Sequence, residues 1–350
     1  ILDLSKNGKQ PMMLNNGKFV LIYNGEIYNY EALRSELKGT GVAFAGVSDT
    51  EVMLMAIETW GLAAALERFV GMFAFALWDR HEQKLTLVRD RLGIKPLYWG
   101  HFGSQFLFGS ELKALLAVNG WPREVNRNAL TAYMRWNYVP SPHSIFVGVH
   151  KLSPGCILTL NAGGTPEITR WWNARTVTQR AMTEGIDPGT TAALNGFHNV
   201  LSEAVGARMI SDVPLGAFLS GGIDSSAVVA AMQEISSKKI QTHSIGFAEN
   251  DYDERKAAKI VANYLNTDHH EFVFTANDAM DTIPKLGQIY CEPFADSSQI
   301  PTFFLCKKTK QNVTVALSGD GGDELFGGYN RYILFHRFQS LILKFPVSIR

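Results

Sequence analysis

Cysteine, net charge and long apolar runs are all scarce in this sequence of 350 residues. Its three cysteines, Cys156, Cys291 and Cys306, lie far apart, which argues against a disulfide framework and against a structural zinc site. Lysine plus arginine and aspartate plus glutamate each number 33, so the zero net charge gives no general attraction to nucleic acid or anionic lipid. The longest apolar run, residues 69–78, is too short to cross a membrane. We therefore expect a cytoplasmic protein with neither a nucleic-acid nor a membrane partner.

What the sequence does have is length and a globular composition, with 46% hydrophobic residues. This length favours two domains. Turn clusters at 161–166 and 187–189 predict a first domain at 1–165, a linker at 166–190 and a second domain at 191–350. The chain begins at Ile1, and residues 345–350 show no helix stop or closing strand, so we expect it to be truncated at both ends.

The first half has the pattern of an antiparallel sheet with flanking helices. Runs rich in β-forming residues predict strands at 18–23, 72–79, 84–89 and 105–108, the first of which is expected to end at Asn24-Gly25. Apolar periodicity predicts helices at 28–37 and 50–60, with Asp49 near the N-cap of the second.

In the second half, strands and helices alternate, a pattern typical of a doubly wound parallel sheet. The predicted strands are 213–219, 240–247, 271–274 and 313–317, and the predicted helices are 191–209, 225–234 and 253–265. Ligands of such sheets bind beyond the carboxyl ends of the strands, so the informative residues should follow the strands.

One glycine-rich turn follows the predicted strand 213–219 and leads into a helix. Glycines there allow the backbone to approach a ligand, and the free N–H groups of the helix N-terminus face an anion. No Gly-Lys-Ser/Thr follows, which excludes a Walker loop. The turn has the form of a phosphate site, and its residues are Ser220, Gly221, Gly222, Ile223, Asp224, Ser225 and Ser226.

A second glycine-rich turn, Ser318-Gly-Asp-Gly-Gly-Asp-Glu324, follows the predicted strand 313–317 and carries three acids. Bare carboxylates would repel the phosphates of a nucleotide unless a hard cation lay between them. Mg²⁺ takes one or two carboxylates together with phosphate oxygens, so we predict Asp224 and Asp323 as its ligands.

Together these motifs resemble the glutamine-hydrolysing asparagine synthetase family. The first turn resembles the PP-loop of ATP pyrophosphatases, which cleave ATP between the α- and β-phosphates, and the second continues as SGDGGDELFGGY. In the first half, Asn24-Gly-Glu-Ile-Tyr-Asn29 resembles the NGEIYN motif of class II glutaminases, and 48–51, 71–76, 89–98 and 110–114 fit the same family. The resemblance implies an αββα Ntn-type glutaminase domain followed by a doubly wound, adenine-nucleotide-binding PP-loop domain.

The resemblance also implies roles for individual residues. Asn24 and the Gly25 N–H would form the oxyanion hole for glutamine, while Glu26 and Asp49 would hold its α-amino end. Residues 292–302 would help to line the acceptor pocket. ATP would contact the PP-loop residues above together with Leu219, Ile245, Ser318 and Gly319.

Two departures from the family pattern matter for the chemistry. Asp320 stands where asparagine synthetases commonly have glutamate, a residue linked to β-aspartyl-AMP formation, so its carboxylate is one methylene shorter. The glutaminase nucleophile of the family is an N-terminal cysteine, whereas this chain starts at Ile1. We expect that cysteine, and a C-terminal part of the synthetase domain, to be absent from the chain.

The resemblance predicts an enzyme that converts aspartate to asparagine with ammonia from glutamine, with ATP and Mg²⁺ as cofactors. It leaves open a homodimer and three other functions: amidation of another carboxylate such as a sugar acid, a non-catalytic ATP binder, and a tRNA-modifying PP-loop enzyme. The run His269-His270-Glu271 resembles a metal cluster, but neighbours on a strand point to opposite faces, so we expect a structural role.

Overall fold

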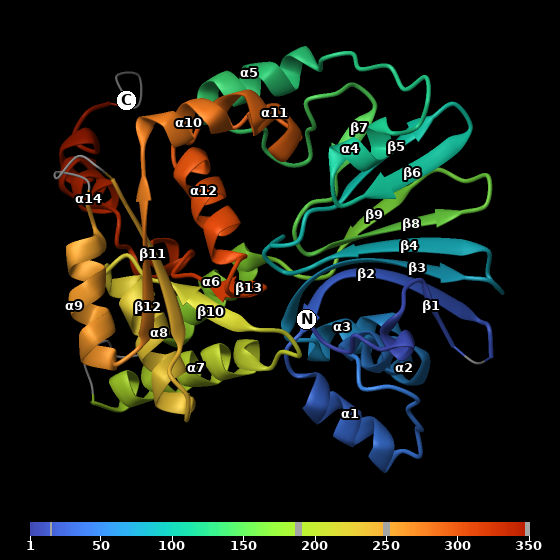
Figure 1. The fold of residues 1–350 in the computed structure, drawn as a ribbon. Helices are drawn as coiled ribbons and strands as arrows, with labels where there is room; N and C mark the ends of the chain where they lie inside the picture. The colour runs from blue at the N-terminus through green and yellow to red at the C-terminus, as the bar shows by residue number, and fades with distance from the viewer. Residues whose placement is uncertain (15, 186–190, 248–252, 347–350) are drawn as a thin grey trace. The chain divides into compact units, whose positions relative to one another are not determined.

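The computed structural model describes residues 1–14, 16–185, 191–247 and 253–346. The chain forms two compact units (Figure 1). Unit 1 consists of Ile1–Phe197, Ile210–Asp212 and Met280–Ile300, and unit 2 of His198–Met209, Val213–Ala279 and Pro301–Arg350. No helix in the described ranges is long and apolar enough to cross a membrane.

Unit 1 is built on two antiparallel sheets. The larger sheet has the order β1-β2-β3-β4-β8-β9, and the smaller has the order β6-β5-β7. The strands of the larger sheet are β1 (Met12–Met13), β2 (Phe19–Ile27), β3 (Gly71–Asp79), β4 (Lys84–Arg89), β8 (Cys156–Asn161) and β9 (Glu167–Arg170). Those of the smaller sheet are β5 (Tyr98–Phe102), β6 (Gln105–Gly109) and β7 (Val149–Lys151).

Helices cover the outer face of each sheet. The helical segments of this unit are η1 (Lys6–Gly8), α1 (Tyr30–Gly39), α2 (Asp49–Trp60), α3 (Leu62–Arg68), α4 (Leu112–Leu116), α5 (Arg127–Trp136), α6 (Ala174–Glu184), η3 (Ile283–Lys285) and α11 (Leu286–Ile289). One apolar core joins α1–α3 to the larger sheet, a second lies between the two sheets, and a third joins the smaller sheet to α4 and α5. This stacking confirms the predicted αββα architecture.

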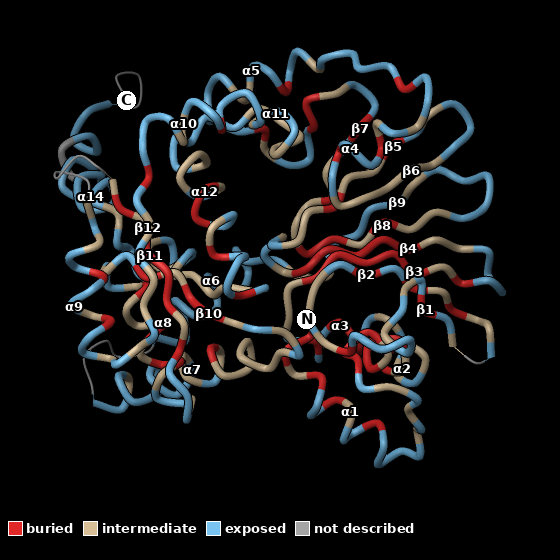
Figure 2. The backbone as a smooth tube through the Cα atoms, in the orientation of Figure 1, coloured by how far each residue is buried: buried red, intermediate tan, exposed pale blue. Residues whose placement is uncertain are grey.

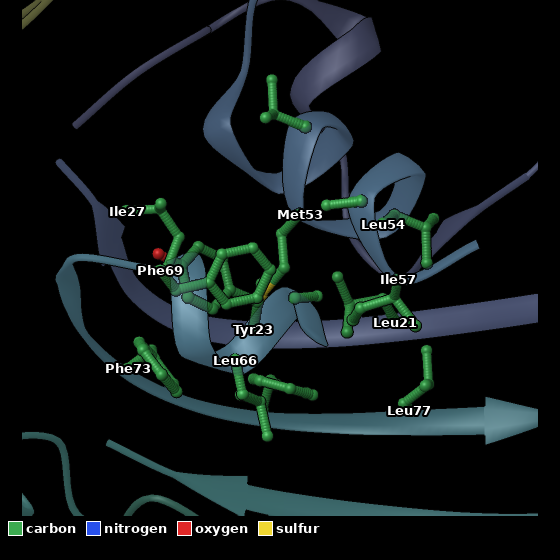
Figure 3. Close-up of a cluster of buried hydrophobic side chains, with 14 of the residues drawn as sticks. Leu21, Tyr23, Ile27, Met53, Leu54, Ile57, Leu66, Phe69, Phe73 and Leu77 are labelled. Atoms are coloured by element: carbon green, nitrogen blue, oxygen red, sulfur yellow. The ribbon is translucent and has the colours of Figure 1, made fainter. Parts of the chain in front are cut away.

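A large cluster of buried apolar residues lies between α1–α3 and the larger sheet, where Figure 2 shows buried segments of the chain. Leu21 and Ile27 of β2 face Met53 and Leu54 of α2, and all four side chains are fully buried (Figure 3). Alternate residues of β2 point into this core, so the strand residues between them, which are exposed or partly exposed, lie on the opposite face. The core therefore fixes the strand that carries the predicted glutamine-binding residues.

One local expectation for unit 1 needs correction, and the structure adds detail to two others. Strand β2 does not end at Asn24-Gly25 but continues to Ile27, because Gly25 stays paired with Phe73 of β3. The N-cap of α2 is Ser48, whose side chain accepts a hydrogen bond from the Glu51 N–H, and Asp49 is the first helical residue. The segment predicted as a linker contains β9, which pairs with β8, and α6; residues 186–190 of it lie outside the described residues.

Unit 2 contains a parallel sheet in the order β12-β11-β10-β13. Its strands are β10 (Leu215–Phe218), β11 (Gln241–Phe247), β12 (Asp268–Phe274) and β13 (Val315–Leu317). The helices of this half are α7 (Thr191–Met209), α8 (Ile223–Ile235), α9 (Arg255–Leu265), α10 (Ala276–Thr282), α12 (Gln299–Thr309), α13 (Gly322–Phe326) and α14 (Asn330–Ile342).

Helices pack on both faces of this sheet. Lys259 of α9 forms an ion pair with Glu271 of β12, whereas Phe304 of α12 packs edge-on against Phe274, three residues further along the strand. Residues three apart on a strand point to opposite faces, so α9 and α12 cover different faces. The doubly wound arrangement predicted from the sequence is thus confirmed.

The His269-His270 pair also follows strand alternation. His269 bonds through its ring nitrogens to Thr242 and Ser244, whereas His270 stacks on the buried ring of His243 on the other face. The described residues contain no group of three or more His, Cys, Asp or Glu side chains that could hold a metal ion.

Candidate active sites

The first candidate site lies on β2, where Asn24, Gly25 and Glu26 follow one another. The Nδ2 group of Asn24 donates a hydrogen bond to the Ser110 hydroxyl at 2.8 Å. Gly25 is required by close packing, since a Cβ at this position would lie 2.1 Å from the carbonyl oxygen of Met72. An amide nitrogen carries two N–H groups, so Ser110 engages one of them and leaves the other free to stabilise an oxyanion.

Asp49, at the start of α2, brings a second carboxylate to this strand. It is only 5% exposed, and its Oδ2 atom accepts hydrogen bonds from the Tyr23 hydroxyl and the Ile27 N–H, both at 2.9 Å. Burial raises the pKa of Asp49 despite these donors. Burial also raises the pKa of Glu26; the ammonium of Ile1, 3.6 Å from Oε2 of Glu26, opposes this rise, and the negative charge of Asp49 adds to it. Two carboxylates that repel each other in this way are stabilised by an ammonium group, which fits the predicted binding of an α-amino end.

Ser110 is expected to control the orientation of Asn24. Replacing Ser110 with alanine removes the acceptor and lets the amide rotate, so kcat for glutamine hydrolysis by the full-length protein should fall about tenfold, which corresponds to ~1.4 kcal/mol of barrier. KM should stay near the wild-type value, and Ser110→Thr, which keeps the hydroxyl, should retain activity. Glutamate release measured against glutamine concentration gives both constants. An alanine variant with unchanged kcat would show that Ser110 does not orient the amide.

The second candidate site begins where β10 ends. The chain turns through Ser220–Gly222 and enters α8, whose N-cap is Gly222. The hydroxyl of Ser225, which is 9% exposed, lies 3.0 Å from the Ser220 hydroxyl and donates to the Gly222 carbonyl at 3.2 Å. The N-cap residue, Gly222, has no side chain that could accept a hydrogen bond from the first turn of α8. These hydroxyls therefore fix the shape of the loop and leave the first N–H groups of α8 for an anion.

The neighbouring strand β13 delivers the second glycine-rich loop. Strands β10 and β13 are paired in parallel, with Ala217 opposite Leu317, so both loops leave the same edge of the sheet. The Ser318 hydroxyl donates to the Asp320 carboxylate at 3.0 Å, and the Gly322 N–H donates to the Gly319 carbonyl at 3.1 Å. The second loop then enters the short helix α13.

The two loops are in direct contact, and glycine makes this possible. A Cβ on Gly319 would lie 2.7 Å from the backbone nitrogen of Ser225, and one on Gly322 would lie 2.4 Å from Cγ of Asp224. The backbone preceding Asp323 thus packs against the side chain of Asp224.

Neither carboxylate of the predicted magnesium pair, Asp224 and Asp323, is neutralised by the described part of the chain. Among the described residues, neither side chain accepts a hydrogen bond or forms an ion pair. Two unpaired carboxylates beside a helix N-terminus fit a divalent cation that also binds phosphate oxygens. These observations are compatible with the predicted pair; the assignment of Mg²⁺ to it stays a prediction.

Two further predicted nucleotide contacts, Leu219 and Ile245, differ in how far their side chains are exposed. Leu219 is 1% exposed and packs in the core with α7, α8 and α9, so only its main chain is left for a ligand. Ile245 lies on β11 and is partly exposed. The positive φ of the PP-loop belongs to Gly221, at 83°, and not to Gly222, at −69°. A bulky residue at 222 would therefore meet no forbidden φ.

Two neighbouring glycines should therefore respond differently to substitution. Gly221→Ala combines the positive φ with a Cβ 2.6 Å from the Ala257 backbone, so it should lower the free energy of unfolding by about 1–3 kcal/mol. A Cβ on Gly222 would approach only the Ser220 hydroxyl among the described residues, at 3.3 Å, so in Gly222→Val the fold should persist while ATP affinity falls about tenfold. Urea unfolding and calorimetric titration with ATP measure the two effects. Unchanged ATP affinity in Gly222→Val would show that the loop does not wrap a phosphate.

Sequence patterns did not reveal the supporting residues of the first site. Tyr23, whose hydroxyl bonds to Asp49, looks like an ordinary core residue of an alternating strand, and only its place directly before Asn24 could have drawn attention to it. Ser110 was part of a recognised motif, yet its contact with Asn24 joins positions 86 residues apart. Such pairs follow from strand order in the fold.

Comparison with known proteins agrees with both halves. A glutamine amidotransferase domain model matches residues 1–172, and an asparagine synthase model matches residues 196–345. The putative glutamine-hydrolysing asparagine synthetase 2 of Methanocaldococcus jannaschii is 37% identical over 370 residues, covering 100% of this chain and 69% of the relative. Asparagine synthetase 1 of Bacillus subtilis is 36% identical over 332 residues, covering 95% of this chain and 51% of the relative.

The chain spans between about half and about two thirds of the length of these relatives. A solved glutamine phosphoribosylpyrophosphate amidotransferase from B. subtilis covers 77% of this chain at 16% identity with a TM-score of 0.35, which is too low to support an argument. The domain models and the curated relatives agree over nearly the whole sequence. The chain therefore belongs to the family of glutamine-hydrolysing asparagine synthetases.

Proposed function

We propose that the protein amidates aspartate to asparagine with ammonia from glutamine, through a β-aspartyl-AMP intermediate with release of AMP and pyrophosphate. The observation that carries this proposal is the meeting of two glycine-rich loops beyond the paired strands β10 and β13. They combine a helix N-terminus, which attracts phosphate, with two carboxylates that have no hydrogen-bond or ion-pair partner among the described residues and so attract a cation. Family membership supplies the expected substrates glutamine, aspartate and ATP.

The chemistry divides between the two sites. In the first, Asn24 and the Gly25 N–H would stabilise the oxyanion formed when a nucleophile attacks the glutamine amide, while Glu26 and Asp49 hold the α-amino group. In the second, an oxygen of the acceptor carboxylate attacks the α-phosphorus of ATP, and the bond to the β-phosphate breaks. Ammonia then attacks the acyl carbon, and AMP leaves.

The PP-loop and the second loop would bind different parts of the nucleotide. We assign the pyrophosphate to the residues from Ser220 to Ser226, and the nucleotide contacts beside them to Ser318, Gly319 and the main chain of Leu219. Bound Mg²⁺ would neutralise phosphate charge during the transfer. Asp224 and Asp323 would hold it, and the Ser318 hydroxyl bonds to the Asp320 carboxylate at 3.0 Å and so keeps that carboxylate at the loop.

The identity of the acceptor is tested by product analysis. The full-length protein, given ATP, Mg²⁺, glutamine and aspartate, should form asparagine, glutamate, AMP and pyrophosphate. Because Asp320 is shorter than the glutamate usual in the family, a sugar acid is the alternative acceptor to be tested in parallel. AMP formation with a sugar acid and none with aspartate would refute aspartate as the substrate; ADP in place of AMP would refute the adenylate.

The remaining expectations from the sequence form part of the same proposal. They are a glutaminase domain at 1–165 and a synthetase domain at 191–350, a cytoplasmic location, and a homodimer as an open option. Light scattering of the purified full-length protein decides the last of these, since a dimer would have twice the mass of the chain.

A further inference from the structure

Residues Met280–Ile300 belong to unit 1, although the asparagine synthase model that matches residues 196–345 spans them. A short stretch of this segment, residues 290–299, is here called the strap. It is attached to unit 1 by backbone contacts: Phe294 forms a bridge with Tyr138, and the Ala295 N–H donates to the Asn137 carbonyl at 2.9 Å. The strap therefore lies in unit 1, the glutaminase unit, although its sequence falls within the match to the asparagine synthase model.

The side-chain carboxylate of Glu292 holds the strap to unit 1. Oε1 of Glu292 accepts a hydrogen bond from the Ile145 N–H at 2.8 Å, and Oε2 accepts one from the Tyr98 hydroxyl at 3.4 Å. The same Oε2 atom forms an ion pair with Lys151, whose ammonium also donates to the Val139 carbonyl. Burial and the nearby Glu292 charge raise the pKa of Tyr98, so its hydroxyl remains a donor.

This ion pair differs from the surface pairs of unit 1 in its burial. The side chains of Lys151 and Glu292 are 14% and 10% exposed, whereas those of Arg68 and Glu36 are 42% and 51% exposed. Removing two charges from water offsets much of their attraction, so such a pair adds little net stability compared with apolar residues. Its effect is to define a position, because removing one partner leaves the other charge buried and unpaired.

Hydrogen bonds within the strap connect its first residues to its last, so Glu292 also fixes the position of the strap's C-terminal end. The Gln299 side chain donates to the Phe294 carbonyl at 2.7 Å, and the Tyr290 hydroxyl donates to the Gln299 carbonyl at 3.3 Å. Gln299 is the first residue of α12, which crosses from unit 1 into unit 2 at Ile300–Pro301. Residues 310–314 connect α12 to β13, which carries the Ser318 loop.

We propose that Glu292 is a positioning residue that couples the two reactions by fastening the strap, and with it the start of α12, to the glutaminase unit. The inference rests on the proposed function. Glutamine hydrolysis needs only the first site, and synthesis from added ammonium needs only the second. Transfer of ammonia from one to the other requires that the segment joining them hold its place.

The test is the amount of AMP formed per glutamate released by the full-length protein. Lys151→Met removes the ammonium partner of the Glu292 carboxylate, so this ratio should fall about fivefold or more with glutamine as donor. Glutamate release and ammonium-supported AMP formation by Lys151→Met should each stay near wild type. Glu292→Gln should lower the ratio as well, Lys151→Arg should retain coupling, and Glu36→Gln is the matched control at the exposed pair.

A merely structural role would lower the three activities of Lys151→Met together and would overturn the proposal, as would an unchanged ratio in that variant. The ratio is measured with whichever carboxylate supports AMP formation in the wild type. A wrong acceptor therefore refutes the proposed function alone, while the ratio still judges Glu292.

Discussion

Asp224→Asn should abolish most AMP formation while leaving the protein folded. The side chain of Asp224 packs against Gly322 of the second loop, and among the described residues its carboxylate has no hydrogen-bond or ion-pair partner. An amide of the same size keeps this packing but loses the charge that a divalent cation requires. The expected loss is about 100-fold or more in pyrophosphate–ATP exchange, or ~2.7 kcal/mol of transition-state stabilisation.

The exchange is measured at saturating Mg²⁺, with circular dichroism to follow the fold. Asp268→Asn provides a matched control, because Asp268 is a half-exposed carboxylate on β12 of the same unit. It should leave the exchange unchanged. Exchange near the wild-type rate in Asp224→Asn would remove Asp224 from the site and with it the predicted magnesium pair.

Asp49→Asn should have the second largest effect, on the use of glutamine. The carbonyl oxygen of the new amide could still accept from Tyr23 and Ile27, so the strand and helix should stay in place. The charge that attracts an α-amino group would be lost, and kcat/KM for glutamine should fall about 100-fold or more, since buried charge-pair partners contribute ~2–5 kcal/mol. Ammonium-supported synthesis should be unaffected.

The same substitution should stabilise the fold. Burial raises the pKa of Asp49, so the folded state binds its proton more readily than the unfolded state does. The charged form therefore costs stability, and this cost appears as pH rises through the folded pKa. Asp49→Asn should raise the unfolding temperature more at pH 8 than at pH 3, which lies below the ordinary pKa of an aspartic acid, 3.8, so that the protonated acid resembles the amide. A lower unfolding temperature at pH 8 would show that the ionised carboxylate is a net stabilising group.

Much of unit 2 could be predicted because its local patterns agree with its fold. The helix at 191–209 and the strands around 215–218 and 241–247 follow directly from apolar periodicity. In a parallel sheet the carboxyl ends of the strands lie at one edge, so loops from β10 and β13 meet even though they are about a hundred residues apart in sequence. Helices α10, α12 and α14 were not predicted, and the contact that Gly319 and Gly322 make with α8 depends on the fold.

Unit 1 was less predictable where contacts are distant or strands are irregular. Asn24-Gly25 is a typical turn dipeptide, yet pairing with β3 overrides that local preference and extends β2. Strands β1, β5, β7, β8 and β9 were not predicted, and β1 and β7 are only two and three residues long. The capture of Glu292 by Ile145, Tyr98 and Lys151 joins residues more than 140 positions apart, and no local pattern encodes it.

The central claim, that the second site activates an acceptor carboxylate as an acyl-adenylate, is tested most directly by isotope transfer. Aspartate labelled with ¹⁸O in its β-carboxylate is supplied to the full-length protein with ATP, Mg²⁺ and glutamine. The attacking oxygen stays on the α-phosphorus when ammonia displaces AMP, so mass spectrometry should find one labelled oxygen in AMP and none in pyrophosphate. Label in inorganic phosphate, with ADP as the nucleotide product, would contradict the account.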